Sequence, residues 1–222
     1  MAKNYINTYT INSILHLMEN GSLTVPAFQR GFVWRKENVK ELFESINGGY
    51  PIGILIAVEH DQKHFEVASN KLTLFPEISP ENILSTKRLW ILDGSQRLAS
   101  LYNVLLGKDN SFALIYDLER KKFSFPDKFK GKSVFLNMSS LFKVREYMQL
   151  QAEISKLRNS ETLLEELYEM HNRFTNYQVP IQVITDVNDP DIVEIFMRIN
   201  TRGISLSKDE VEKSTKYRNA EQ

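Results

Sequence analysis

The sequence contains no cysteine among its 222 residues. This absence excludes disulfide bonds, cysteine nucleophiles and thiolate metal sites. The sequence also has only four histidines, and they are dispersed along the chain. Lys and Arg number 28, as do Asp and Glu, so the formal net charge is zero. That balance argues against a protein that coats nucleic acid by bulk charge, although it is compatible with a local basic patch.

Long apolar runs are absent as well. No run approaches the roughly 18 residues that a membrane span needs, and the first residues lack the apolar core of a signal peptide. We therefore expect a cytoplasmic protein with no membrane partner. With 42% hydrophobic and 25% charged residues, the composition is that of an ordinary globular protein, and we expect one domain over residues 1–222.

Hydrophobic periodicity predicts both helices and strands. Residues 69–87 contain two prolines and are expected to form a long loop. The acidic region 139–175 is expected to be a helical insertion that packs on the same domain. We expect helices over 8–20 and 36–47, a helix starting at Asp189-Pro190, a further helix starting near Ser207, and strands over 54–58, 112–116 and 179–185.

The most informative stretch is Trp90–Tyr102, which is expected to be a strand, a tight turn and a helix. The turn falls at Asp93-Gly94, because Gly tolerates positive φ, and Ser95 is a candidate helix N-cap. A carboxylate, an amide (Gln96) and a guanidinium (Arg97) at a helix N-terminus can form a phosphate or nucleotide site. The alternative is structural, with Asp93 capping the helix and Arg97 pairing with it on the surface.

A second candidate lies in residues 23–34, where Gln29 and Arg30 stand between large apolar residues. Planar polar groups beside an aromatic such as Trp34 suit stacking on a base and hydrogen bonding to its edge. The alternative is that Phe28, Phe32 and Trp34 belong to the core, with the two polar side chains solvated between them.

Residues 117–132 combine six basic residues with Phe123, Phe125 and Phe129. Such alternation can contact a single strand of nucleic acid. The simpler interpretation, which we prefer, is a β-hairpin whose aromatic side chains face inward and whose lysines face water.

Separated motifs in this order resemble the N-terminal domain of GmrSD-type restriction proteins. They are Pro26-Ala-Phe-Gln-Arg-Gly-Phe-Val-Trp34, Tyr50-Pro-Ile-Gly53, Ile91-Leu-Asp-Gly-Ser-Gln-Arg-Leu-Ala-Ser-Leu101 and Ile195-Phe-Met-Arg-Ile-Asn-Thr-Arg-Gly-Ile-Ser-Leu206. The resemblance implies a ParB/sulfiredoxin-like α+β fold with a mixed sheet and flanking helices. It also implies nucleotide binding and NTP hydrolysis at an Asp-Gly-Gln-Gln-Arg signature, coupled to a separate nuclease domain that acts on DNA, including modified DNA, in phage defence.

This chain has Ser95 where the signature has its first Gln. A hydroxyl can still bond a phosphate, but it does not reach as far as an amide. On the resemblance, Asp93, Gln96 and Arg97 would be catalytic, and Asp93 would also hold a Mg²⁺ that accompanies a nucleoside triphosphate. The nucleotide would be bound by Gln29, Arg30, Trp34, Gly94, Ser95, Arg198, Asn200 and Arg202.

The resemblance also implies a nuclease domain beyond the third motif, so we expect this chain to be the N-terminal part of a longer protein or a stand-alone relative that needs a partner. Two other functions stay open. In one, the same cleft senses DNA without catalysis. In the other, the acidic helices of residues 146–170 are a contact surface for a protein partner.

Overall fold

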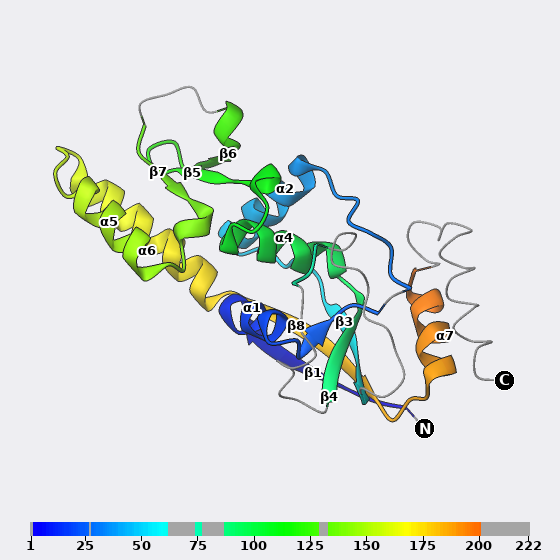
Figure 1. The fold of residues 1–222 in the computed structure, drawn as a ribbon. Coiled ribbons are helices and arrows are strands. Elements are labelled where there is room, and N and C mark those ends of the chain that lie inside the picture. The colour runs from blue at the N-terminus through cyan, green and yellow to red at the C-terminus, as the bar shows by residue number, and fades with distance from the viewer. Residues whose placement is uncertain (1, 27, 62–73, 77–86, 129–132, 201–222) are drawn as a thin grey trace.

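The computed structural model describes residues 2–26, 28–61, 74–76, 87–128 and 133–200. They form a mixed five-stranded sheet, a small three-stranded antiparallel sheet and helices, which confirms the α+β fold (Figure 1). The large sheet has the order β1-β8-β3-β4-β2. Its strands are β1 (Lys3–Thr10), β8 (Gln178–Thr185), β3 (Leu55–Asp61), β4 (Lys87–Asp93) and β2 (Leu23–Thr24).

Within this sheet β1 is antiparallel to β8, and β3 is antiparallel to β4. The pairs β3–β8 and β2–β4 are parallel. The helices are α1 (Ile11–Glu19), α2 (Lys36–Asn47), α4 (Ser95–Leu106), α5 (Val144–Ile154), α6 (Ser160–Asn176) and α7 (Asp189–Asn200). The small sheet has the order β6-β5-β7 and consists of β6 (Lys122–Ser124), β5 (Ile115–Asp117) and β7 (Phe135–Asn137). No helix of the described residues is both long and apolar enough to cross a membrane.

Two hydrophobic clusters bury the two faces of the large sheet. In β3, Ala57 belongs to the main core with α1, α2, α4 and α6, while its neighbour Val58 belongs to a smaller cluster with α7. The same alternation separates Ile91 from Leu92 in β4, because successive side chains of a strand point to opposite faces. The sheet is therefore buried on both sides where β3 and β4 meet α7.

The helical pair α5 and α6 extends away from the large sheet, on the left of Figure 1. These helices confirm the helical region expected over 139–175. Glu166 of α6 is buried and accepts hydrogen bonds from Tyr116 of β5 (2.7 Å) and from Arg173 (3.2 Å). It also forms an ion pair with Lys121, in the turn between β5 and β6, at 2.5 Å. These contacts attach α6 to the small sheet.

Most of the predicted elements are confirmed, with some corrections. The predicted strand over 112–116 was wrong at its start, because Phe112 ends a short 3-10 helix. The side chain of Asp109 accepts the Ser111 N–H at 2.8 Å and fixes that turn, so the strand begins at Ile115. Strand β1 was not predicted. The helix expected over 8–20 was wrong at its start, because residues 8–10 belong to β1 and α1 begins at Ile11, after the N-cap Thr10. The helix expected near Ser207 and most of the loop expected over 69–87 lie outside the described residues.

The preferred interpretation of residues 117–132 is confirmed for the described part. Phe123 and Phe125 are 4% exposed, whereas Lys121 and Lys122 are exposed. The ammonium groups of Lys36 and Lys128 lie over the ring of Phe125. Phe129 lies outside the described residues.

Candidate functional site

The central motif forms the junction between β4 and α4. The strand ends at Asp93, Gly94 is left-handed with φ of 97°, and the helix begins at Ser95. The helix N-cap is therefore Gly94, and the prediction that Ser95 is the N-cap was wrong by one residue. Glycine is required at this turn, because a Cβ on Gly94 would lie 2.2 Å from the Leu55 side chain as well as being strained by the positive φ.

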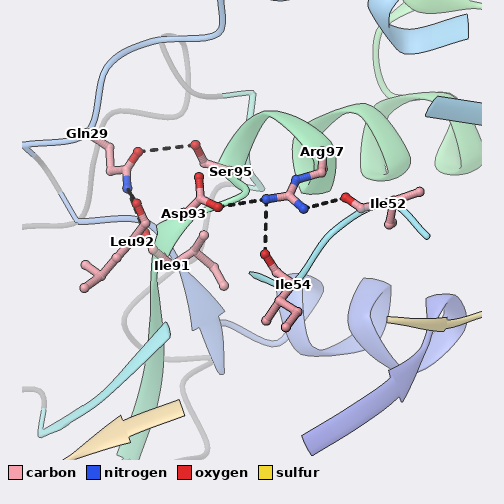
Figure 2. A network of polar contacts seen from close by, with 8 residues as sticks. All are labelled: Gln29, Ile52, Ile54, Ile91, Leu92, Asp93, Ser95 and Arg97. Atoms are coloured by element: carbon pink, nitrogen blue, oxygen red, sulfur yellow. Dashed lines mark hydrogen bonds and ion pairs between the residues drawn. The ribbon is translucent and has the colours of Figure 1, made fainter. Parts of the chain in front are cut away.

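The Arg97 guanidinium holds the segment that precedes β3. It donates to the carbonyl oxygens of Ile52 at 2.6 Å and Ile54 at 3.3 Å, and it pairs with the Asp93 carboxylate at 2.9 Å (Figure 2). The Arg97 side chain is only 15% exposed, whereas that of Asp93 is 41% exposed. The pairing of Asp93 and Arg97 expected under the structural alternative is thus present, but it is part of a larger bridge between two chain segments.

Gly53 lets this bridge form. It has φ of 83°, and a Cβ there would lie 2.8 Å from the Arg97 guanidinium. The carbonyl groups around Gly53 were not among the predicted site residues. The available signal was the Gly in Tyr50-Pro-Ile-Gly53, but a sequence does not reveal that its neighbours supply backbone acceptors.

Gln29 connects the first motif to the end of β4. Its Nε2 donates to the carbonyl oxygens of Ile91 and Leu92, both at 2.9 Å, and its Oε1 accepts from the Ser95 hydroxyl at 3.2 Å (Figure 2). Both ends of the Gln29 amide are thus bonded within the protein. The Ser95 side chain points toward Gln29 and is 9% exposed.

Gln96 holds the loop that carries the rest of the first motif. Its Oε1 accepts from the backbone N–H groups of Val33 (2.8 Å) and Trp34 (3.3 Å), and its Nε2 donates to the carbonyl of Gly31 (3.2 Å). Gln96 is 9% exposed. The structure therefore brings Gln29, Gln96 and Arg97 together around the start of α4, where their side chains hydrogen-bond three chain segments to one another.

Arg30 and Trp34 lie in the loop that Gln96 holds, and both side chains are half-buried. Trp34 packs against the main core. This agrees in part with the alternative interpretation, in which the aromatic residues of this motif belong to the core. Arg30 makes no hydrogen bond or ion pair with other described residues, so its guanidinium is the positive group of this motif that internal contacts do not use. Phe28 is fully buried.

The third motif lies on α7. Arg198 pairs with Glu194 one turn earlier, and the Asn200 amide donates to the Phe196 carbonyl at 2.9 Å. The contact with the first motif is apolar, because the Phe196 ring lies 4.9 Å from that of Phe28. Arg202 lies outside the described residues. Convergence of Arg198, Asn200 and Arg202 on the turn at Asp93 stays a prediction.

The chemistry of this site is compatible with Mg²⁺ held jointly by protein and ligand. The described residues contain no group of three or more His, Asp or Glu side chains that could hold a metal ion alone. Mg²⁺ in nucleotide sites is commonly bound by one or two carboxylates together with phosphate oxygens and waters. Asp93, with one oxygen paired to Arg97 and a side chain 41% exposed, fits that requirement.

Comparison with known proteins identifies a family whose match includes these motifs. The family model described as "GmrSD restriction endonuclease, N-terminal domain" matches residues 11–215. The chain is also similar to an uncharacterized protein of Methanocaldococcus jannaschii, with 25% identity over 84% of this chain. This chain spans 38% of the length of that relative.

Proposed function

Because this chain belongs to the family of GmrSD restriction endonuclease N-terminal domains, we propose that it is the regulatory domain of a DNA restriction or phage-defence protein. Within that role it binds a nucleoside triphosphate with Mg²⁺ at the turn between β4 and α4. A nuclease domain, supplied by a longer chain or by a partner, acts on DNA under the control of this nucleotide. The DNA can carry a modification.

The observation that carries this proposal is the convergence of three chain segments on the start of α4. Arg97, Gln96 and Gln29 each bond to backbone groups of another segment, so the turn is held in one geometry before any ligand arrives. Preorganisation of this kind lowers the cost of ordering on binding. A helix N-terminus, a hydroxyl and a guanidinium are groups that bind phosphate.

The proposal divides the motif residues into two roles. Gln29, Gln96 and Arg97 position the loops, whereas Arg30, Ser95 and the exposed part of Asp93 meet the ligand. Asp93 would hold Mg²⁺, which supplies charge neutralisation at the phosphates. Trp34, with its ring half-buried, offers an edge or face to the base. NTP hydrolysis is the further step that the family resemblance implies, and phosphate release is its direct readout.

The first test is a thermal-shift titration with each common nucleoside triphosphate and Mg²⁺. A ligand that binds only the folded state raises the midpoint temperature of unfolding in a concentration-dependent way. At a ligand concentration of 100 times the Kd, the free energy of unfolding rises by about 2.7 kcal/mol. We expect this shift with at least one nucleotide. Asp93→Asn and Arg30→Ala should lose it, because they remove a Mg²⁺ ligand and a phosphate-binding cation.

Matched controls come from exposed residues far from the turn. Asp127→Asn and Arg145→Ala change the same chemical groups at exposed positions and should retain the shift. Arg97→Ala is a poor probe, because it also removes the bonds to Ile52 and Ile54. The proposal would be contradicted if no nucleotide raised the midpoint temperature of the unchanged chain. It would also be contradicted if the double variant Asp93→Asn, Arg30→Ala kept the full increase.

A second candidate function is DNA sensing without catalysis. The observation that favours it is the internal use of Gln29, Gln96 and Arg97, which leaves few motif side chains for chemistry. In this case Arg30 and its neighbours contact a DNA backbone. Binding to duplex DNA that weakens steeply with salt and does not depend on nucleotide would favour this function. Nucleotide-dependent stabilisation without DNA would exclude it as the sole function.

A further inference from the structure

The connection between α2 and β3 is held by side chains from two sides. On one side, the Arg97 guanidinium donates to the carbonyl oxygens of Ile52 and Ile54 (Figure 2). On the other side, the Tyr177 hydroxyl donates to the Tyr50 carbonyl at 2.6 Å and accepts from the Ile52 N–H at 3.1 Å. Both backbone groups of Ile52 are therefore bonded to side chains of other elements.

Tyr177 is well placed to hold this connection, because it lies between the end of α6 and the start of β8. Phe174 and Val179, on either side of it in the chain, are fully buried. Strand β8 in turn pairs in parallel with β3, the strand into which the connection leads. Burial raises the pKa of Tyr177, so the hydroxyl keeps the proton that it donates to Tyr50.

The backbone next to Ile52 passes close to the Arg97 guanidinium. Pro51, which precedes Ile52, has a fixed φ and no N–H of its own. Gly53, which follows it, has φ of 83°, and a Cβ there would lie 2.8 Å from the guanidinium. A displacement of Ile52 therefore moves an acceptor of Arg97 directly.

We propose that Tyr177 is a positioning residue for the turn at Asp93, and thereby for the nucleotide site, and that it acts through Ile52 and Arg97. Its hydroxyl fixes Ile52, the Ile52 carbonyl orients the guanidinium, and the guanidinium orients the Asp93 carboxylate at 2.9 Å. The groups that orient a metal-binding carboxylate affect metal affinity without touching the metal. This inference rests on the proposed function, in which Asp93 holds Mg²⁺.

Tyr177→Phe tests the proposal, because it removes the hydroxyl and keeps the ring. The Kd is measured by isothermal titration calorimetry, well below the midpoint temperature of unfolding, with Mg²⁺ and whichever of ATP, GTP, CTP and UTP gives the largest thermal shift. We expect the Kd to rise at least about fivefold, somewhat less than the roughly tenfold to hundredfold effect of losing a direct partner of a metal ligand.

Tyr147→Phe is the matched control. Tyr147 is also half-buried, and its hydroxyl donates to a backbone carbonyl, that of Leu167, at 3.3 Å. This bond joins α5 to α6 and does not involve the connection between α2 and β3. The substitution should leave the Kd of the nucleotide unchanged, even though it removes the same chemical group.

Hydrogen exchange of the chain without nucleotide provides a second measurement. The Leu98 amide bonds to the Gly94 carbonyl at 3.1 Å in the first turn of α4. In Tyr177→Phe the amides of Ile52 and Leu98 should exchange at least about fivefold faster relative to those of α1. A hydroxyl that only stabilises the fold would instead accelerate the slow amides of all elements alike and leave the Kd of the folded chain unchanged.

The proposal would be overturned if Tyr177→Phe bound the nucleotide as tightly as the unchanged chain. An equal rise of the Kd in Tyr147→Phe would also overturn it, as would uniform acceleration of exchange. If no nucleotide binds the unchanged chain, the proposed function fails, whereas the exchange rates still decide the inference: acceleration at Leu98 in Tyr177→Phe alone would retain the positioning of the turn, and its absence would overturn it.

Discussion

At the scale of single residues, the motif side chains bind mostly to backbone. Gln29 and Arg97 donate to carbonyl oxygens, and Gln96 accepts from two N–H groups and donates to a third residue. Amides and guanidinium groups can make several directed hydrogen bonds at once. A motif that is expected to be catalytic therefore also determines the shape of its own site, and substitutions within it combine effects on binding and on stability.

Gly94 provides a prediction with an internal control. Gly94→Ala should lower the free energy of unfolding by about 3 kcal/mol, because a positive φ costs an alanine about 1 kcal/mol and the new Cβ would overlap Leu55 at 2.2 Å. Gly49 also has a positive φ, 69°, but nothing lies within 4 Å of a Cβ there. Gly49→Ala should therefore cost only about 1 kcal/mol.

Urea denaturation of the two variants and the unchanged chain measures this difference. Equal losses at Gly94 and Gly49 would mean that the contact with Leu55 relaxes without cost. In that case the close approach of Gly94 to β3 would not be a reason for glycine at this turn.

At the scale of elements, the junction of α6 with the small sheet depends on a buried charge. Burial by itself would raise the pKa of Glu166, but hydrogen bonds from Lys121 and Tyr116 and the positive charges of Lys121 and Arg173 hold that pKa below its ordinary value. The pKa of Tyr116 is raised, by burial first and then by its bond to Glu166. The carboxylate is thus the charged partner at this junction and Tyr116 stays neutral.

These shifts predict an acid-sensitive junction. Because the pKa of Glu166 is lower in the folded chain, its contribution to stability is complete above the ordinary glutamate pKa of about 4.3 and is lost as the pH falls through the folded value. Glu166→Gln should lower the free energy of unfolding by about 2 kcal/mol at pH 7, since it leaves positive groups beside a buried neutral side chain. Denaturant unfolding at pH 7 and at several acidic pH values measures both effects.

Tyr116→Phe is the matched control, because it removes one hydrogen bond and leaves the charge. This substitution should lower the free energy of unfolding by about 1 kcal/mol and should preserve the loss of stability at acidic pH. If Glu166→Gln retained the full acid-dependent loss of the unchanged chain, other carboxylates would be its source.

At the scale of the whole molecule, the sheet separates two cores of unequal size. The main core combines α1, α2, α4, α6 and the small sheet, whereas the second cluster joins α7 to Phe28, Val58 and Leu92. In the part of the chain that the structure describes, the second cluster has six buried hydrophobic residues, far fewer than the main core. The opening of α7 should therefore require less free energy than global unfolding. This matters for the proposed function, because α7 carries Arg198 and Asn200 of the third motif.

Phe196→Ala tests the independence of α7. We expect faster hydrogen exchange over Asp189–Asn200 and little change in α6 or β8, since the truncation creates a cavity only in the second cluster. Phe174→Ala, in the main core, should instead lower global stability by about 3–5 kcal/mol and accelerate exchange throughout. Uniform acceleration in Phe196→Ala would show that the two cores unfold as one.

Much of this organisation could be predicted from local sequence. The α2 bounds of Lys36 and Asn47 were predicted without error, because an apolar stripe is followed by a glycine pair. The strand, turn and helix at Asp93-Gly94 were likewise recognisable. The strand β1 was missed, because an edge strand exposed on both sides shows no alternation of polar and apolar residues.

The sequence by itself determined most of the helices and strands, the turn that requires Gly94, and the set of motifs that place the chain in its family. These depend on periodicity, backbone sterics and residue identity, which are local properties. Only the tertiary structure decided that Gln29, Gln96 and Arg97 bind the backbone of distant segments, and that β1 is the end strand of the five-stranded sheet. Such contacts join residues 45 to 63 positions apart, and their geometry depends on how the whole chain packs.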